Sequence, residues 1–230
     1  MFLPKLGFAE VKKAIIFSPL PEWNYFSQKF DFIDSVKWLN IFLKRVNKDV
    51  IFGGPLISSP TLALLIELLK EKGISEVLFV GWAGKSPYGS LEIGDLFIPE
   101  KAFSLEGTSK LYYKRKKVFK ADRDFLLNLE RFFKISNIPF KIGKILTVDA
   151  PHVVEKNLSD FKLLLNKAQA MDMETSALYA VSAYYNIKAL SLLFITDEIG
   201  KTLSKRPESK LKTLREKLLL FFRHFIENVQ

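Results

Sequence analysis

The 230-residue sequence contains no cysteine and only two histidines, His152 and His224. Without cysteine, the chain can form no disulfide, offer no thiol nucleophile and supply no thiolate to a metal ion. The two histidines lie far apart in the sequence, so a zinc site is not expected either. We therefore expect no metal site and no cofactor.

Long apolar runs are also missing, because none reaches the roughly 18 residues that indicate a membrane span. The N-terminal stretch over residues 1–17 interrupts its apolar residues with charged ones, which makes it a poor signal peptide. We therefore expect no membrane association and a cytoplasmic location.

Negative charge is in short supply, with 25 acidic residues against 35 lysines and arginines and a net charge of +10. Such an excess fits a nucleic acid or a small anionic ligand as partner, but also a solvated, lysine-rich surface. The most basic stretch, Lys110 to Lys120, interleaves aromatic and cationic residues as single-strand binders do, and its alternation also fits an exposed hairpin strand. We favour the solvated surface and keep nucleic-acid binding as an alternative.

Apolar runs alternate with amphipathic segments along the whole chain. We expect strands over 13–17, 49–53, 76–81, 91–104, 141–150 and 188–197, and helices over 35–46, 61–72, 124–133, 174–185 and 211–229. This alternation predicts a single α/β domain over residues 1–230, with a mixed, largely parallel, twisted central sheet flanked by helices.

Glycines and acidic residues gather where these strands end. They occupy Gly53–Pro55, Gly81–Gly84, Asp149–His152, Thr196–Glu198 and the strand-to-helix stretch Asp172–Glu174. Ligands of α/β proteins bind at the carboxyl ends of the strands, so these stretches are candidate site segments. Each one alone fits a helix cap or a turn equally well.

Four stretches carry a family resemblance: GGP from Gly53, EVLFVGWAG with LEIGDLFIPEKAFSLEGTSKLY, LTVDAP, and AMDMETSALYAVSAYYNIKALSLLFITDE. From Asp49 onwards the chain resembles the nucleoside phosphorylase and nucleosidase superfamily, which includes purine nucleoside phosphorylase, uridine phosphorylase and methylthioadenosine nucleosidase. The resemblance implies a nucleoside phosphorylase-like domain that cleaves the N-glycosidic bond of a small nucleoside. It also implies self-association as a dimer or a hexamer.

The resemblance assigns roles to individual residues. Glu174 matches the glutamate that accepts hydrogen bonds from the ribose hydroxyls, and Asp197 matches the acid that protonates a leaving purine. Met173 would lie against the sugar, with a plain core role as the alternative. Asp172, Trp82 and Gly81 would border the substrate. His152 and Phe140 are weaker candidates for an aromatic contact with the base, and a loop position on the surface is the alternative for His152.

Two departures concern the co-substrate. Phosphorolytic relatives carry an arginine and a hydroxyl residue where this chain has Phe79 and Trp82, so inorganic phosphate as co-substrate would need Lys85, or Arg45 of a neighbouring subunit. Glu22 matches the glutamate that activates water in the nucleosidases, although an exposed position after the Pro-Leu-Pro turn is the alternative. The arginine that nucleosidases place four residues before the aspartate is Leu193 here. We therefore hypothesise hydrolysis in place of phosphorolysis, with a catalytically inactive nucleoside-binding protein as the alternative.

Overall fold

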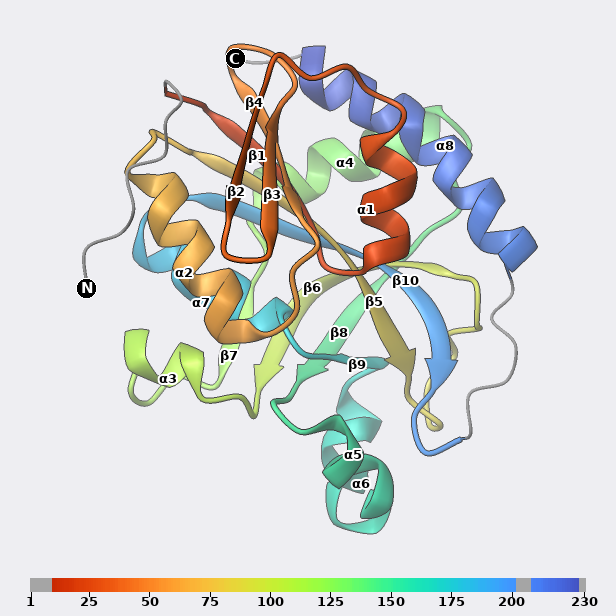
Figure 1. The fold of residues 1–230 in the computed structure, drawn as a ribbon. Helices are drawn as coiled ribbons and strands as arrows, with labels where there is room; N and C mark the ends of the chain where they lie inside the picture. The colour runs from red at the N-terminus through yellow and green to blue at the C-terminus, as the bar shows by residue number, and fades with distance from the viewer. Residues whose placement is uncertain (1–9, 202–207, 228–230) are drawn as a thin grey trace.

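The computed structural model describes residues 10–201 and 208–227, which fold into a layered α/β structure (Figure 1). The strands are β1 (Lys13–Phe17), β2 (Asp34–Trp38), β3 (Ile41–Arg45), β4 (Val50–Gly54), β5 (Glu76–Lys85), β6 (Leu96–Ser104), β7 (Val118–Lys120), β8 (Lys141–Thr147), β9 (Ala170–Asp172) and β10 (Lys188–Glu198). The helices are α1 (Leu20–Ser27), α2 (Ser59–Lys70), α3 (Thr108–Tyr112), α4 (Arg123–Ile135), α5 (Pro151–Lys156), α6 (Leu158–Lys167), α7 (Thr175–Tyr184) and α8 (Glu208–Glu227).

All ten strands belong to one sheet with the order β10-β6-β8-β9-β5-β1-β4-β3-β2, and β7 adds to β6. The long strands β4, β1, β5 and β10 pair in parallel, as do β6, β8 and β9. Strand β10 also pairs antiparallel with β6, so β5, β9, β8, β6 and β10 close into a ring. The predicted mixed sheet flanked by helices is confirmed, and the ring is an addition to that prediction.

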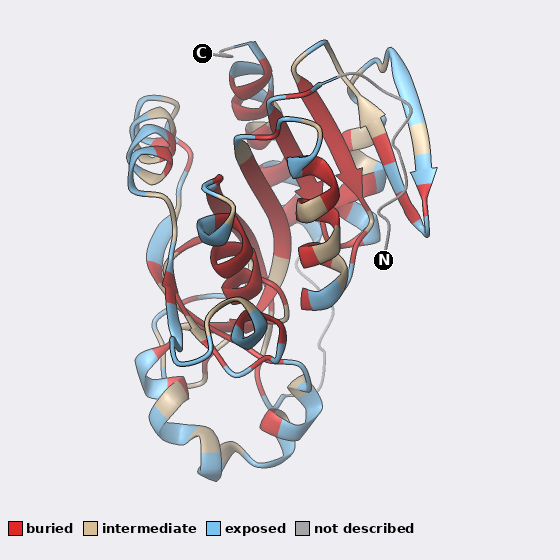
Figure 2. Ribbon diagram, turned by 90° about the vertical axis from the view of Figure 1, so that its left-hand side faces the viewer, coloured by how far each residue is buried: buried red, intermediate tan, exposed pale blue. Residues whose placement is uncertain are grey.

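The central strands are apolar on both faces because helices cover both sides of the sheet. Successive residues alternate between the two layers: Ile16 packs in the layer under α2 and α7, whereas Ile15 and Phe17 pack in the layer under α1, α4 and α8. The same alternation holds along β5, where Phe79 faces the first layer and Leu78 the second. Figure 2 shows these buried residues concentrated in the central strands and the helices packed on them.

Helix α4 illustrates how the flanking helices form. Asp122 precedes the helix and its Oδ1 accepts a hydrogen bond from the backbone N–H of Phe125 at 2.9 Å, which satisfies a donor that the first turn leaves without a partner. Phe125, Leu129 and Phe133 recur every four residues and form its buried face. The predicted helix over 124–133 is therefore confirmed.

The predicted helix over residues 35–46 is wrong, because β2 and β3 form an antiparallel hairpin there. Trp38 pairs with Ile41 across a two-residue turn in which Leu39 has φ +53°, a left-handed conformation that ends any helix. Ile41 and Leu43 are buried while Phe42 between them is 37% exposed, which is the period of a strand. The apolar spacing of this stretch fits both periods, and pairing with β4 selects the strand.

Smaller differences from prediction also occur. Strand β5 continues to Lys85 through residues expected to form a loop, because β10 pairs with it along its whole length. The basic stretch 110–120 is not one strand: it begins in α3 and ends in β7, with Lys114 to Lys117 exposed between them. Residues 228 and 229 of the predicted last helix lie outside the described residues.

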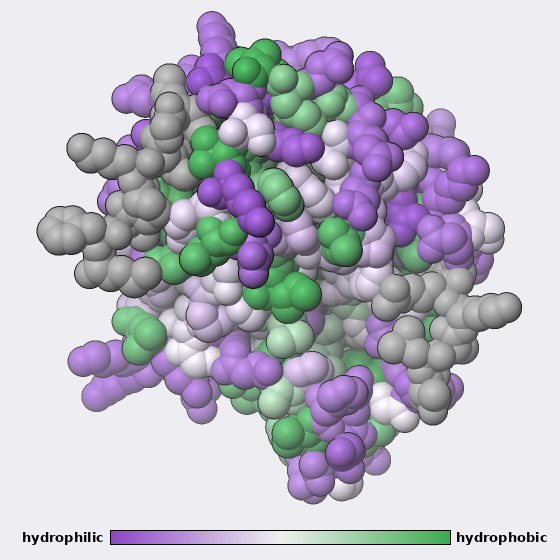
Figure 3. Space-filling model, viewed as in Figure 1, coloured by the Kyte–Doolittle hydropathy of each residue, from purple (hydrophilic) through white to green (hydrophobic). Residues whose placement is uncertain are grey.

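Within the described residues, no helix combines the length and apolar character needed to cross a membrane, and no three metal-ligating side chains cluster. Figure 3 shows hydrophilic residues interspersed with small apolar patches on one face, and the α5–α6 projection at its lower edge is mostly hydrophilic.

Candidate active site

A cavity of about 330 Å³ opens at the carboxyl ends of the central strands. Ser18 and Pro19 reach it after β1, Trp82 to Gly84 from the end of β5, Met171 to Glu174 from β9, and Thr196 and Asp197 from β10. The register brings these segments together, since Gly84 pairs with Asp197 on one side and with Met171 on the other. Parts of four predicted strand exits thus share one cavity wall, whereas Gly53–Pro55 lies off it.

Glu174 lies on this wall with only 4% of its surface exposed, between the end of β9 and the first turn of α7. Its Oε1 accepts a hydrogen bond from the backbone N–H of Ser58 at 2.8 Å. Ser59 Oγ donates to the carbonyl of the neighbouring Met173 at 2.6 Å, so the segment before α2 holds this turn in place. Burial, and then the negative charge of Asp172, raise the pKa of Glu174 above its usual range.

Asp172 has a different role from Glu174. Its Oδ1 accepts a hydrogen bond from Thr147 Oγ1 at 2.7 Å, and its Oδ2 accepts from the N–H and hydroxyl of Thr175 at 2.9 and 2.6 Å. Thr147 in turn accepts from the N–H of Ser176 at 2.9 Å. Both carboxylate oxygens therefore tie β8, β9 and α7 together, although burial still raises the pKa of Asp172. Asp172 holds the turn that presents Glu174.

Asp197 lines the cavity from the end of β10. Its Oδ1 accepts a hydrogen bond from the hydroxyl of Thr196 at 2.7 Å. Its Oδ2 lies 3.0 Å from the point where a side chain on Gly84 would begin. Any residue other than glycine at position 84 would therefore crowd the Asp197 carboxylate and push it from its position on the wall.

Glu22 is fully buried in α1, contrary to the exposed alternative. Its Oε1 accepts hydrogen bonds from Nε and Nη2 of Arg215 in α8, at 3.0 and 2.7 Å. Arg215 also binds Glu208. Burial is the largest influence on Glu22 and raises its pKa, although Arg215 and the nearby indole of Trp82 act in the opposite direction.

A family model described as Phosphorylase superfamily matches residues 45–227. The chain belongs to this superfamily. Purine nucleoside phosphorylase of Brevibacillus brevis is 30% identical over 137 residues, covering 58% of this chain and 56% of the relative. Uridine phosphorylase of Thermococcus kodakarensis is 29% identical over 163 residues, covering 63% and 58%. The chain thus spans little more than half the length of these relatives.

Solved structures of the superfamily share the fold. The 5′-methylthioadenosine/S-adenosylhomocysteine nucleosidase of Campylobacter jejuni superimposes with a TM-score of 0.79 at 19% identity, covering 95% of this chain and 100% of the other. A uridine phosphorylase of Vibrio fischeri gives 0.76 at 21% identity, covering 90% and 86%. These likenesses confirm the predicted fold class, and the family model confirms the predicted superfamily.

Met173 and Trp82 also line the cavity, whereas three other predicted site residues do not. Gly81 is buried behind the wall, where an added side chain would begin 2.8 Å from Phe79 and 2.9 Å from Leu193. His152 points outward with 90% of its side chain exposed and pairs with Glu155 at 2.7 Å. Phe140 packs on Phe133, in the apolar layer under α4 and α8.

The two cations proposed for phosphate lie off the wall of this chain's cavity. Lys85 follows Gly84 but lies 3.7 Å from both Glu92 and Glu198. Arg45 pairs with Ile51 near the beginning of β4, at the other end of the sheet, and its Nε donates to the carbonyl of Asn47 at 3.2 Å. A contribution of Arg45 from a neighbouring subunit remains a prediction.

Sequence reasoning missed Arg215 and Glu155. Arg215 falls on the apolar stripe of α8 between Leu211 and Leu218, and a charge on a buried stripe is a signal that a partner lies opposite. With Glu155, the cavity wall holds four carboxylate residues, and none of its described lining residues is lysine, arginine or histidine. The lining residues are Ser18, Pro19, Leu20, Pro21, Ile57, Trp82, Ala83, Gly84, Pro151, Glu155, Met171, Asp172, Met173, Glu174, Thr196 and Asp197.

Proposed function

We propose that the chain hydrolyses the N-glycosidic bond of a purine nucleoside. The carboxylate-rich wall, without a described cation, is the observation that carries this proposal. Breaking the bond builds positive charge on the sugar, which nearby carboxylates stabilise more in the transition state than in the neutral substrate. A phosphate dianion would need cationic donors once it left water, so the same wall disfavours phosphorolysis.

Glu174 is proposed to hold the ribose. A carboxylate can accept from two adjacent hydroxyls at once, and such charge-assisted hydrogen bonds are among the stronger ones in proteins. The Ser58 N–H and the Ser59–Met173 contact fix the turn that carries it. Met173 would supply the apolar surface beside the sugar.

Asp197 is proposed to deliver a proton to the leaving base. A purine anion is a poor leaving group, so proton transfer during bond cleavage lowers the barrier. Thr196 occupies one oxygen of the carboxylate, and the space over Gly84 accommodates the other. The names of several curated relatives, including that of Brevibacillus brevis, agree with a purine substrate.

Glu22 is the proposed base that activates water. Its raised pKa moves it towards neutrality, where a general base is most effective. The Glu22 carboxylate has no exposed surface, and Glu22 is not among the described residues that line the cavity, so it does not meet cavity water in this conformation. That observation favours a second candidate function, a nucleoside-binding protein without turnover.

Product analysis tests the proposal. The protein is incubated with inosine, adenosine and methylthioadenosine without phosphate, and phosphate is then titrated in. We expect the free sugar at a rate independent of phosphate, and Glu22→Gln should abolish it. Ribose 1-phosphate formed only with phosphate would contradict hydrolysis. Saturable nucleoside binding with no product under either condition would select the second candidate.

A further inference from the structure

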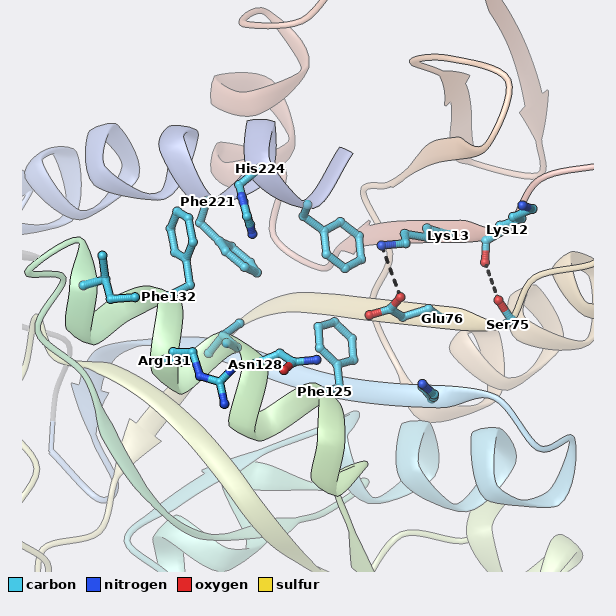
Figure 4. A pocket seen from close by; sticks show the side chains of 14 residues that line it. Lys12, Lys13, Ser75, Glu76, Phe125, Asn128, Arg131, Phe132, Phe221 and His224 are labelled. Atoms are coloured by element: carbon cyan, nitrogen blue, oxygen red, sulfur yellow. Dashed lines mark hydrogen bonds and ion pairs between the residues drawn. The ribbon is translucent and has the colours of Figure 1, made fainter. Parts of the chain in front are cut away.

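A second cavity, of about 500 Å³, lies at the opposite end of the same strands (Figure 4). Lys13 at the start of β1, Glu76 at the start of β5 and Lys188 at the start of β10 form its floor, while α4 and α8 form its walls. Glu76 and Gly84 are eight residues apart on β5, which places the two cavities about 26 Å from each other at about 3.3 Å per residue. The two cavities are therefore separate sites.

The charge of this cavity is the reverse of that of the active-site cavity. Among its described lining residues, four are cationic, Lys12, Lys13, Arg131 and Lys188, and one, Glu76, carries a carboxylate. Lys13 Nζ lies 3.4 Å from Glu76 and 4.5 Å from the centre of the Phe225 ring, so this cation is held in the interior. The other three cationic residues are exposed, where they can meet an anion from solvent.

Aromatic rings form the walls between these cations. Phe125 of α4 stacks on Phe225 of α8, with ring centres 5.6 Å apart and an angle of 9°. Phe132 of α4 stacks on His224 of α8 at 4.5 Å and 29°. Figure 4 shows Phe125 and Phe132 projecting from α4 and His224 from α8 around the cavity. Such walls offer flat apolar surfaces to a planar ring.

We propose that this cavity binds an aromatic anion of the size of a mononucleotide. The volume falls within the range of small-molecule sites, the walls match a planar ring, and the exposed cations match a phosphate or another anionic group. A neutral nucleoside would leave the cations without their counterpart. The site is thus selective for charged ligands, whereas the proposed active site takes neutral ones.

Fluorescence titration with 8-anilino-1-naphthalenesulfonate, an aromatic sulfonate that brightens in apolar surroundings, tests the proposal on the whole chain. We expect saturable binding that AMP displaces and adenosine does not. Arg131→Glu/Lys188→Glu should weaken dye binding by about tenfold or more, because both exposed cations become anions at the mouth. Arg131→Gln/Lys188→Gln should weaken dye binding by a smaller factor. Because it removes the two positive charges without adding negative ones, it tests the site even if the double glutamate variant does not fold.

The matched control is Lys114→Glu/Arg115→Glu, which reverses two exposed cations in the stretch between α3 and β7. This pair should change dye binding less than about twofold, since its charges lie outside the cavity. Equal losses in the two double variants would show attraction by net charge alone and overturn the site. Displacement by adenosine as effective as by AMP would place the dye in the active-site cavity, and absence of saturable binding would also overturn the proposal.

Discussion

The two ends of the central strands have opposite chemistry. At the carboxyl ends, the described wall of one cavity holds four carboxylate residues and no cationic one; at the amino ends, the other cavity has four cations and one carboxylate. Strands β5 and β10 line both cavities, and β1 lines the second and leads into Ser18 at the first. The middle residues of these strands are apolar and buried between helices, so they separate the charged residues of the two cavities.

This comparison shows how little the overall charge says about a site. A net charge of +10 points towards anionic partners. The proposed active-site cavity is nevertheless rich in carboxylates, and cationic residues gather elsewhere, at the opposite cavity and in the exposed stretch Lys114 to Lys117. The charges that line a cavity decide what it can bind, and the net charge of the chain does not reveal them.

The largest expected effect comes from removing the proposed proton donor at the acidic end. Asp197→Asn keeps the shape of the side chain, but an amide does not act as an acid. Turnover of purine nucleosides should fall by about 100- to 10,000-fold, while nitrophenyl ribosides, whose leaving group needs no proton, should lose far less. Initial rates on both substrate types measure the difference.

Asp149→Asn is the matched control for Asp197→Asn. Asp149 is exposed after β8, accepts a hydrogen bond from Gly107 N–H at 2.9 Å and lies off the wall of the active-site cavity. It should leave both rates nearly unchanged. If Asp197→Asn reduces both substrate types equally, Asp197 supports the structure and the acidic end is not a proton source.

The next effect concerns Arg215, a cation that faces the acidic end from behind its wall. Arg215→Met leaves the buried Glu22 without its ion-pair partner, which should lower the free energy of unfolding by about 3–5 kcal/mol at neutral pH. The loss should shrink as the pH falls, because a protonated Glu22 no longer needs a cation. Urea denaturation at several pH values measures it.

Arg223→Met is the control on the same helix, since Arg223 is exposed and lies over the ring of Phe30 at 5.9 Å. It should cost less than about 1 kcal/mol. The double variant Glu22→Gln/Arg215→Met should recover part of the stability. Equal costs for the two arginine variants would mean that the Glu22–Arg215 pair contributes no stability of its own.

The acidic end was largely predictable from the sequence because its residues follow buried strands. Asp197 comes directly after an apolar run, and the parallel strands β5 and β10 bring their carboxyl ends to one edge. Met173 and Glu174 follow the short strand β9, which pairs antiparallel with β5, so their place came from the family resemblance and not from this rule. The distinct roles of Asp172 and Glu174 were not predictable. Thr147 and Thr175, which occupy both oxygens of Asp172, reach it only through the pairing of β8 with β9 and the start of α7.

The basic end could not be predicted in the same way. Its residues come from strand beginnings and from two helices, α4 and α8, that are far apart in the sequence. The prediction of a helix over residues 35–46 was wrong for a related reason. The apolar spacing there fits a helix as well as a strand, and only the pairing with β4 selects the strand. The periodic pattern of each segment does not record which distant segment it will contact.

The smallest expected effect concerns Glu174, whose ionisation in the folded chain should lower the free energy of unfolding. Burial and the charge of Asp172 raise the pKa of Glu174 above the ordinary 4.5, so the folded chain holds this proton more tightly than the unfolded chain. The resulting stability is present below pH 4.5 and is lost as the pH rises through the folded value. Glu174→Gln cannot ionise and avoids this loss. Without nucleoside, it should therefore be more stable than the parent at pH 8, by on the order of 2 kcal/mol, and this advantage should be much smaller at pH 5.

The control Glu198→Gln should instead be less stable than the parent at pH 8, because Lys201 lowers the pKa of Glu198. Denaturation curves at both pH values decide the matter: an advantage of Glu174→Gln that does not change with pH would come from packing, and a loss at pH 8 would mean that the ionised carboxylate is well accommodated even in the empty cavity.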